Sequence, residues 1–247
     1  MIILYSYLLI FVVGAFFGWI LELFYRRKKH GCWVNPGFLN GPTLPIYGFG
    51  LVLMHFIASF NYGLDNKYLI ILIQTLVSGV GMTVIELFAG LIFIKYMHVL
   101  LWDYSKESFN YKGIICLKFS IIWIILGFLF IILVNPFISD IARWFIENVD
   151  IVGFFLGMYY GVFIIDFFMS LNITEKIKKF AKEHDIVVSY ENLKYHIKGK
   201  YEELKEKKAS FILPFKTNKI TFRELLEGYL EKHKELRKKG DLDENDK

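Results

Sequence analysis

Apolar residues along the chain gather in five stretches separated by short polar segments. These stretches are residues 2–25, 44–60, 68–96, 113–137 and 151–171. A helix that crosses a membrane needs roughly 20 mostly apolar residues, and only residues 44–60 fall short of that length. The pattern predicts an all-α fold in which residues 1–171 form a polytopic membrane helix bundle of about five spans.

Charged residues are concentrated after Leu171, where 19 of the 29 Lys and Arg and 15 of the 24 Asp and Glu lie. We expect residues 172–247 to form a charged, mostly helical cytoplasmic tail. Asn172 and Glu175, like Thr221 and Glu224, have the spacing of a capping box, which predicts that a helix begins at each pair.

An apolar stripe at helical spacing follows the second cap, formed by Phe222, Leu225, Leu226, Tyr229 and Leu230. It has two interpretations: the helix packs on a neighbouring helix or on the membrane surface, or it docks a partner protein.

The composition supports a membrane location, since 55% hydrophobic residues and a mean hydropathy of +0.42 exceed what a soluble core needs. The net charge of +5 does not indicate a nucleic-acid partner, because Glu and Lys are mixed throughout the tail and no nucleic-acid-binding motif occurs. No metal or cofactor motif occurs either. The expected partner is the lipid bilayer, and the sequence does not decide whether the chain forms a homo-oligomer.

Basic residues predict the orientation, because short cytoplasmic loops are enriched in Lys and Arg. Eight lie in or beside the connections after the first and third spans, and two lie in the other two loops. The first set is Arg26, Arg27, Lys28, Lys29, Lys95, Lys106, Lys112 and Lys118, and the second is Lys67 and Arg143. This asymmetry predicts an N-terminus outside and a C-terminus in the cytoplasm.

Three acidic residues lie within predicted spans: Glu22, Glu86 and Asp166. Such residues are costly in lipid and often mark a functional site. Glu22 is one helical turn before Arg26, so an ion pair is the alternative to a functional role. Glu86 lies deeper in its span, which favours function, whereas Asp166 lies near a span end.

The connection between the first two spans is rich in Gly and Pro from His30 to Gly50. This composition argues against a continuous helix and predicts a structured loop at the membrane interface. Trp33 supplies apolar bulk, and Asn35 and Asn40 supply hydrogen-bonding groups that could line a site. The alternative is a tight interfacial turn without a ligand.

Glycines recur at four-residue intervals in the first and last predicted spans. They are Gly14 and Gly18 in the first, and Gly153, Gly157 and Gly161 in the last. This spacing predicts close helix packing within the bundle or between subunits.

The first and third spans share a pattern in which an in-span Glu is followed by a Trp and then by an Asn before the next span. The matched residues are Glu22, Trp33 and Asn40 in one unit and Glu86, Trp102 and Asn110 in the other. A parallel repeat would bring them to equivalent places around one cytoplasm-facing cavity. The different spacings leave chance similarity as the alternative.

Four runs in the first 130 residues stand out: Gly18-Trp19-x-x-Glu22-x-x-Tyr25-Arg26, Trp33-Val34-Asn35-x-Gly37-Phe38-Leu39-x-Gly41-Pro42, Pro45-Ile46-Tyr47-Gly48-Phe49-Gly50 and Trp102-Asp103-Tyr104-Ser105. These runs resemble the bacterial CmpB-like family of ABC-transporter type IV permeases. The resemblance implies a bacterial inner-membrane protein and a role in transport. No GxxxxGK[ST] phosphate loop occurs, so ATP hydrolysis would require a separate ATP-binding subunit.

Three functions are consistent with these features. The first is a transport component whose substrate site is formed by Glu22, Glu86, Trp33, Asn35, Asn40, Trp102, Asp103 and Asn110. The second is a scaffold or sensor that docks a partner through its tail. The third is an intramembrane enzyme that would use Glu86, Asp103 and Asp166, assisted by His30, His98 and Cys32, but no HExxH or GxSxG motif supports it.

Overall fold

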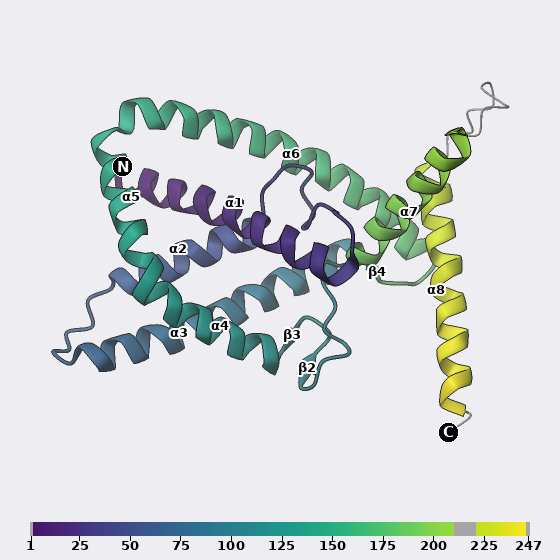
Figure 1. The fold of residues 1–247 in the computed structure, drawn as a ribbon, viewed down its shortest axis with the longest axis horizontal. Helices are drawn as coiled ribbons and strands as arrows, with labels where there is room; N and C mark the ends of the chain where they lie inside the picture. Colours follow the sequence, from purple (N-terminus) through teal and green to yellow (C-terminus); the bar gives the residue numbers. More distant parts are fainter. Residues whose placement is uncertain (1, 210–220, 246–247) are drawn as a thin grey trace.

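The computed structural model describes residues 2–209 and 221–245, and long helices dominate it (Figure 1). Four helical segments in this part of the chain are long and apolar enough to cross a membrane. They are α1 (Ile2–His30), α3 (Lys67–Ile92) with its π-helical continuation η1 (Phe93–Met97), α4 (Leu117–Leu129) with η2 (Phe130–Val134) and α5 (Asn135–Glu147), and α6 (Val149–Glu183). The apolar helix α2 (Pro45–Ser59) is shorter. The predicted fold class, an all-α membrane helix bundle, is confirmed.

Short strands and two further helices complete the described chain. The strand β1 (Val99–Leu100) pairs in parallel with β4 (Val188–Ser189), and β2 (Asn110–Tyr111) pairs antiparallel with β3 (Ile115–Cys116). The tail helices are α7 (Tyr190–Ala209) and α8 (Phe222–Asn245). The β1–β4 pair joins the segment after α3 to the segment after α6, so the tail is tied directly to a loop of the bundle.

The expected loop between the last two spans is instead the helix α5. Asp140 and Arg143 lie on its exposed side, whereas Ile138 and Phe145 are buried. The sequence pattern there is that of an amphipathic helix, which a search for continuous apolar stretches does not detect.

The predicted helix start at Asn172 is wrong, because α6 runs without a break from Val149 to Glu183. The predicted boundary at residue 171 therefore lies inside one helix, where the sequence changes from apolar to charged. The second capping box is confirmed: the Thr221 amide donates to Glu224 Oε2 at 3.0 Å, and the Glu224 amide donates to Thr221 Oγ1 at 3.3 Å.

Glycines allow two pairs of helices to approach closely. A Cβ atom at Gly18 would lie 2.2 Å from the Tyr47 side chain on α2, and one at Gly79 would lie 2.3 Å from Ile124 on α4. The predicted close packing at Gly14 and Gly18 is thus confirmed within the bundle. A Cβ at Gly153, Gly157 or Gly161 would meet no atom within 4 Å, so these glycines of α6 face away from the described chain.

Two apolar cores hold the molecule together. The bundle core consists of buried residues from α1, α2, α3, η2 and α5, namely Ile10, Met54, Met82, Phe130 and Ile138. The tail core joins α6, α7 and α8 to the loop residues Phe38 and Leu39 and to β1. The apolar stripe of α8 lies in this second core, which agrees with packing on a neighbouring helix.

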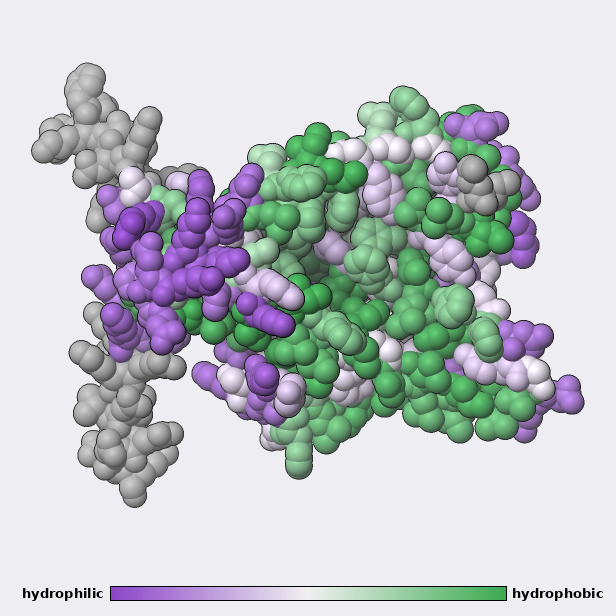
Figure 2. All heavy atoms as spheres, turned by 180° about the vertical axis from the view of Figure 1, so that it is seen from behind, coloured by the Kyte–Doolittle hydropathy of each residue, from purple (hydrophilic) through white to green (hydrophobic). Residues whose placement is uncertain are grey.

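Hydropathy separates the two ends of the molecule. Figure 2 shows an apolar body and a hydrophilic tail at one end, with a smaller hydrophilic fringe at the opposite end. We call the end where α1 stops and the tail begins the tail-side end. The end that carries α5 and the α2–α3 connection is called the far end (Figure 1).

Candidate functional site

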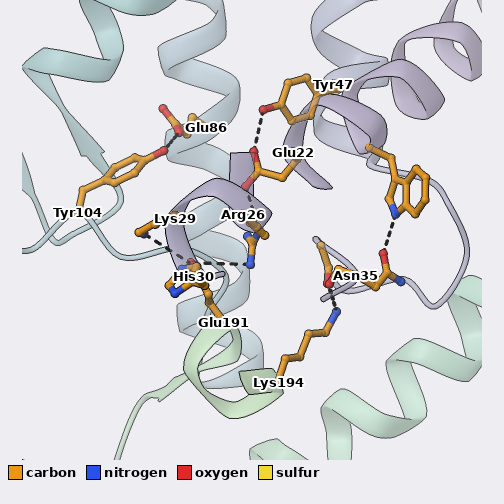
Figure 3. Close-up of polar contacts among 12 residues, drawn as sticks. Glu22, Arg26, Lys29, His30, Asn35, Tyr47, Glu86, Tyr104, Glu191 and Lys194 are labelled. Atoms are coloured by element: carbon orange, nitrogen blue, oxygen red, sulfur yellow. Dashed lines mark hydrogen bonds and ion pairs between the residues drawn. The ribbon is translucent and has the colours of Figure 1, made fainter. Parts of the chain in front are cut away.

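Glu86 lies on the inner face of α3 and is only 4% exposed. Its carboxylate accepts a hydrogen bond from Tyr104 Oη at 2.9 Å (Figure 3). It accepts a second hydrogen bond from Trp123 Nε1 at 3.2 Å. Tyr104 comes from the loop after β1 and stacks on Phe119 of α4, with ring centroids 4.4 Å apart. Burial, reinforced by Glu86, raises the pKa of the Tyr104 hydroxyl, so this group keeps its proton and remains a donor.

Glu22 lies on α1 and is bound by groups from two helices. Arg26 Nε donates to one carboxylate oxygen at 3.0 Å, and Tyr47 Oη from α2 donates to the other at 3.2 Å (Figure 3). The ion pair with Arg26 is therefore present. The Tyr47 ring also contacts the Trp123 ring, with centroids 6.1 Å apart. One donor to Glu22 thus touches one donor to Glu86, which places the two acids in a single polar cluster.

The Gly/Pro-rich loop between α1 and α2 is structured by its own amides. Asn35 Oδ1 accepts from Trp19 Nε1 at 2.6 Å, and its Nδ2 donates to the carbonyls of Leu39 and Asn40. Trp33 is 48% exposed and packs its ring edge-on against Phe24. Asn35 therefore shapes the loop, and Trp33 lies at its surface.

Asp166 on α6 anchors the same loop. Its carboxylate accepts from the Asn40 amide at 3.1 Å, from Asn40 Nδ2 at 2.9 Å and from the Gly41 amide at 2.8 Å. Ser170 Oγ adds a fourth donor, at 3.3 Å. The carboxylate of Asp166 on α6 thus binds the backbone of the loop and the side chain of Asn40.

The loop between α3 and α4 is held in a comparable way. Trp102 Nε1 donates to the Ile114 carbonyl at 2.7 Å, and Asp103 Oδ1 accepts from the Ser105 amide at 2.9 Å. Asn110 Nδ2 donates to the carbonyls of Ser105 and Glu107. These side chains position the segment that delivers Tyr104 to Glu86. The predicted parallel repeat stays a prediction.

Side chains on one face of the tail helix α7 bind backbone carbonyls of the loop between α1 and α2, a contact that the sequence did not predict. Tyr190, Lys194 and Lys198 are spaced four residues apart. Tyr190 Oη donates to the Phe38 carbonyl at 3.3 Å, and Lys198 Nζ donates to the Trp33 carbonyl at 2.8 Å. Lys194 Nζ donates to the Asn35 carbonyl (Figure 3) and to the Gly37 carbonyl.

Burial governs the charge of Lys194. Burial and, to a smaller extent, the nearby Arg26 lower the pKa of this ammonium group, Asp166 opposes them, and the resulting pKa is about 7. Charge on Lys194 therefore changes near neutral pH. The amine keeps two donor hydrogens when neutral, enough for its two carbonyl partners.

Glu191, one residue after Tyr190, completes the contact between the tail and the bundle. Its carboxylate lies 2.7 Å from His30 Nε2, 3.7 Å from Lys29 Nζ and 3.8 Å from Arg26 Nη1 (Figure 3). Arg26 is 6% exposed and lies between Glu22 of the bundle and Glu191 of the tail. The basic end of α1 has only Glu22 as an acid nearby in sequence, which indicates that a further acidic partner comes from elsewhere in the chain but does not identify Glu191.

Residues 9–171 match a family model described as "Putative ABC-transporter type IV". This match covers more than half of the 247 residues. The chain belongs to this ABC-transporter type IV family. No curated protein and no solved structure matches the chain. Together with the long apolar helices, membership of this family indicates a multi-pass membrane protein that is a component of membrane transport.

The ABC-transporter type IV match includes all eight predicted site residues and Asp166, but it ends before α7 and α8. Of these residues, Glu22 and Glu86 share the polar cluster, whereas the two tryptophans, the three asparagines and Asp103 lie in or support the loops. The contacts made by Glu191 and Lys194 join the matched region to a part of the chain outside the family model. Within the described residues, no group of three or more His, Cys, Asp or Glu could hold a metal ion.

Proposed function

We propose that the chain is a membrane-embedded transport component in which Glu22 and Glu86 form an intramembrane acidic site for a proton or a small cation. The observation that carries this proposal is the shared cluster. Two carboxylates from different helices face the bundle interior, joined by the contact between Tyr47 and Trp123. Intramembrane acids arranged in this way commonly mark pathways.

Glu86 is the more informative of the two acids. Among the described residues it has no ion-pair partner within 4.0 Å, and its two hydrogen-bond donors, Tyr104 and Trp123, carry no charge. An unpaired acid at the centre of a membrane helix costs about 2.5–3.5 kcal/mol on insertion scales. A carboxylate that lacks a permanent cationic partner is available to a mobile one.

The proposal includes an orientation and a partner. Basic residues at the tail-side end support a cytoplasmic tail and an external far end. The membrane we propose is the bacterial inner membrane, which the family resemblance implies. Because the sequence lacks a phosphate-binding loop, ATP-driven transport would use a separate ATP-binding subunit. The alternative of a scaffold that docks partners through its tail loses some support, because the apolar stripe of α8 lies in the tail's own core.

The partner is tested by affinity purification of the intact protein from native membranes in mild detergent, followed by mass spectrometry. Recovery of an ATP-binding subunit would support ATP-driven transport. Recovery of the protein without any ATPase would refute that part and leave an ion gradient as the energy source.

The site is tested by proton flux into proteoliposomes that contain the purified assembly and an internal pH-sensitive dye, with ATP or an imposed ion gradient as the driving force. Glu86→Gln should reduce flux at least tenfold without lowering the melting temperature. The matched control is Glu107→Gln, which changes a partly exposed acid that pairs with Lys118. Wild-type flux in Glu86→Gln would show that this acid is only a packing residue.

A further inference from the structure

One face of α3 carries a straight column of buried side chains that leads from the far half of the bundle to the acidic site. Gln74, Ser78, Met82 and Glu86 follow one another at four-residue intervals, and they are 6%, 0%, 2% and 4% exposed. Residues four apart lie one above another on a helix. The column is polar except at Met82.

Two hydroxyl groups at the far end of this column lack a protein partner. Thr75 Oγ1 and Ser78 Oγ are buried, and neither has a hydrogen-bond partner among the described residues. The usual solution in a membrane helix is a bond to the carbonyl four residues earlier, which Thr83 makes to Gly79 at 3.0 Å. A buried hydroxyl left unpaired costs about 1–3 kcal/mol, and water is its natural partner.

Other polar groups of the far half lie on neighbouring helices. His55 Nδ1 of α2 lies 2.9 Å from Asn135 Oδ1 of α5, and Gln74 Nε2 donates to the Ala58 carbonyl at 3.1 Å. His55 is only 9% exposed. The far half of the bundle therefore contains polar groups that lipid would not stabilise but water would.

An apolar layer separates these groups from Glu86. Met82 interrupts the polar column and packs in the bundle core with Met54, Ile10 and Phe130. Its sulfur lies so close to Gly50 of α2 that a Cβ atom there would be 2.6 Å away. Methionine is unbranched and adapts its shape easily, and an apolar constriction that loses its water closes a path.

We propose that Thr75 and Ser78 line a water-filled half-path that opens at the far side of the membrane, and that the layer around Met82 is the gate between this half-path and Glu86. The conducted species is the proton, since hydroxyl groups and waters can pass one along, whereas none of the buried polar side chains described above in the far half (Gln74, Thr75, Ser78 and His55) is a carboxylate that could bind a metal cation. A proton that enters at the far side moves through water and hydroxyl groups to the carboxylate of Glu86 when the gate is wet. This inference rests on the proposed function of Glu86.

The water path is tested by the reactivity of engineered cysteines, a readout that does not depend on transport. Ser78→Cys, Thr75→Cys and the control Val77→Cys are made in the full chain. Val77 is the neighbour of Ser78 on the same helix, but it is 45% exposed on the outer surface, where lipid would cover it. A membrane-impermeant thiol reagent is added from the far side of sealed vesicles, with the wild-type protein as a blank for Cys32 and Cys116.

We expect Ser78→Cys and Thr75→Cys to react at least tenfold faster than Val77→Cys. Equal rates for all three would overturn the water path. Two reactive positions are used so that misfolding of one variant does not decide the result.

The gate is tested by proton leak through the same protein. Met82→Ala should raise the leak severalfold, Met82→Leu should not, and adding Glu86→Gln to Met82→Ala should abolish the increase. No increase in Met82→Ala would overturn the gate. If the cysteines are unreactive but Glu86→Gln still abolishes flux, the water path is refuted and the proposed site stands. If the cysteines react but Glu86→Gln leaves flux unchanged, the proposed site is refuted.

Discussion

The close contact between α3 and α4 makes Gly79→Ala a sharp test of the packing. A Cβ atom at Gly79 would lie 2.3 Å from Ile124 Cγ1, 2.8 Å from Ile124 Cα and 3.0 Å from Ile124 N. The side-chain atom can rotate away, but the two backbone atoms move only if α4 moves. Because Trp123 precedes Ile124, such a movement would also carry the indole away from Glu86.

The expected cost follows from overpacking, which typically destabilises by about 1–3 kcal/mol. A clash with backbone belongs at the upper end, and the better helix propensity of Ala returns about 1 kcal/mol. The net loss is about 2 kcal/mol, or a melting temperature about 4–8 °C lower for a chain of this size. Tryptophan fluorescence during heating of the purified protein in detergent measures this shift.

Gly157→Ala is the matched control, because a Cβ atom there meets nothing within 4 Å and only the helix propensity changes. Its melting temperature should equal that of the wild type or rise slightly. A Gly79→Ala protein with the same melting temperature as the wild type would refute the close α3–α4 packing. An equal loss in Gly157→Ala would show instead that this face of α6 packs against another subunit.

Two further predictions concern the loop between α1 and α2. The pKa of Lys194 is lowered to about 7 in the folded protein, whereas the ordinary lysine value is near 10.4. Between these two pH values the unfolded chain holds one more proton than the folded protein. The free energy of unfolding therefore rises with pH in this range, by at most about 1.4 kcal/mol per pH unit, and falls as pH is lowered to about 7. Lys194→Met should flatten this part of the melting temperature's pH dependence, whereas the exposed control Lys200→Met should not. An unchanged pH dependence in Lys194→Met would contradict the burial argument. Asp166→Asn leaves one acceptor oxygen for the donors from Asn40 and Gly41, so hydrogen exchange in residues 35–41 should become faster while α6 stays protected. Unchanged exchange in residues 35–41 would show that the loop does not need this acid.

Regular periodicity made most of the bundle predictable from the sequence. Apolar stretches of membrane length predicted the long helices, and the density of Gly and Pro predicted the loop between α1 and α2. The spacing of Gly14 and Gly18 predicted the close contact between helices that α1 makes with α2. The capping box at Thr221 and Glu224 was correct because the chain begins a helix there. These features depend on residues a few positions apart, so a single sequence contains them.

The same kind of local pattern failed at Asn172 because the helix had already begun upstream at Val149. At this point of α6 the neighbouring Thr174 hydroxyl bonds to the Ser170 carbonyl, as it does within a continuous helix. The grip of α7 on the first loop could not be predicted either. Its partners are more than 150 residues apart, and charge patterns alone do not choose among the many basic residues available to Glu191.

Arg26 connects the contact between tail and bundle to the proposed acidic site. Its guanidinium lies 3.0 Å from Glu22 in the acidic cluster and 3.8 Å from Glu191 in α7. Any event that moved α7 would leave Arg26 with Glu22 as its remaining acidic partner and would free the loop carbonyls now bound by Lys194. Because Tyr47 also binds Glu22 and touches Trp123 beside Glu86, the charge balance at the acidic site depends on where the tail lies. A single buried arginine thus links a tail outside the family model to the pair of acids within it.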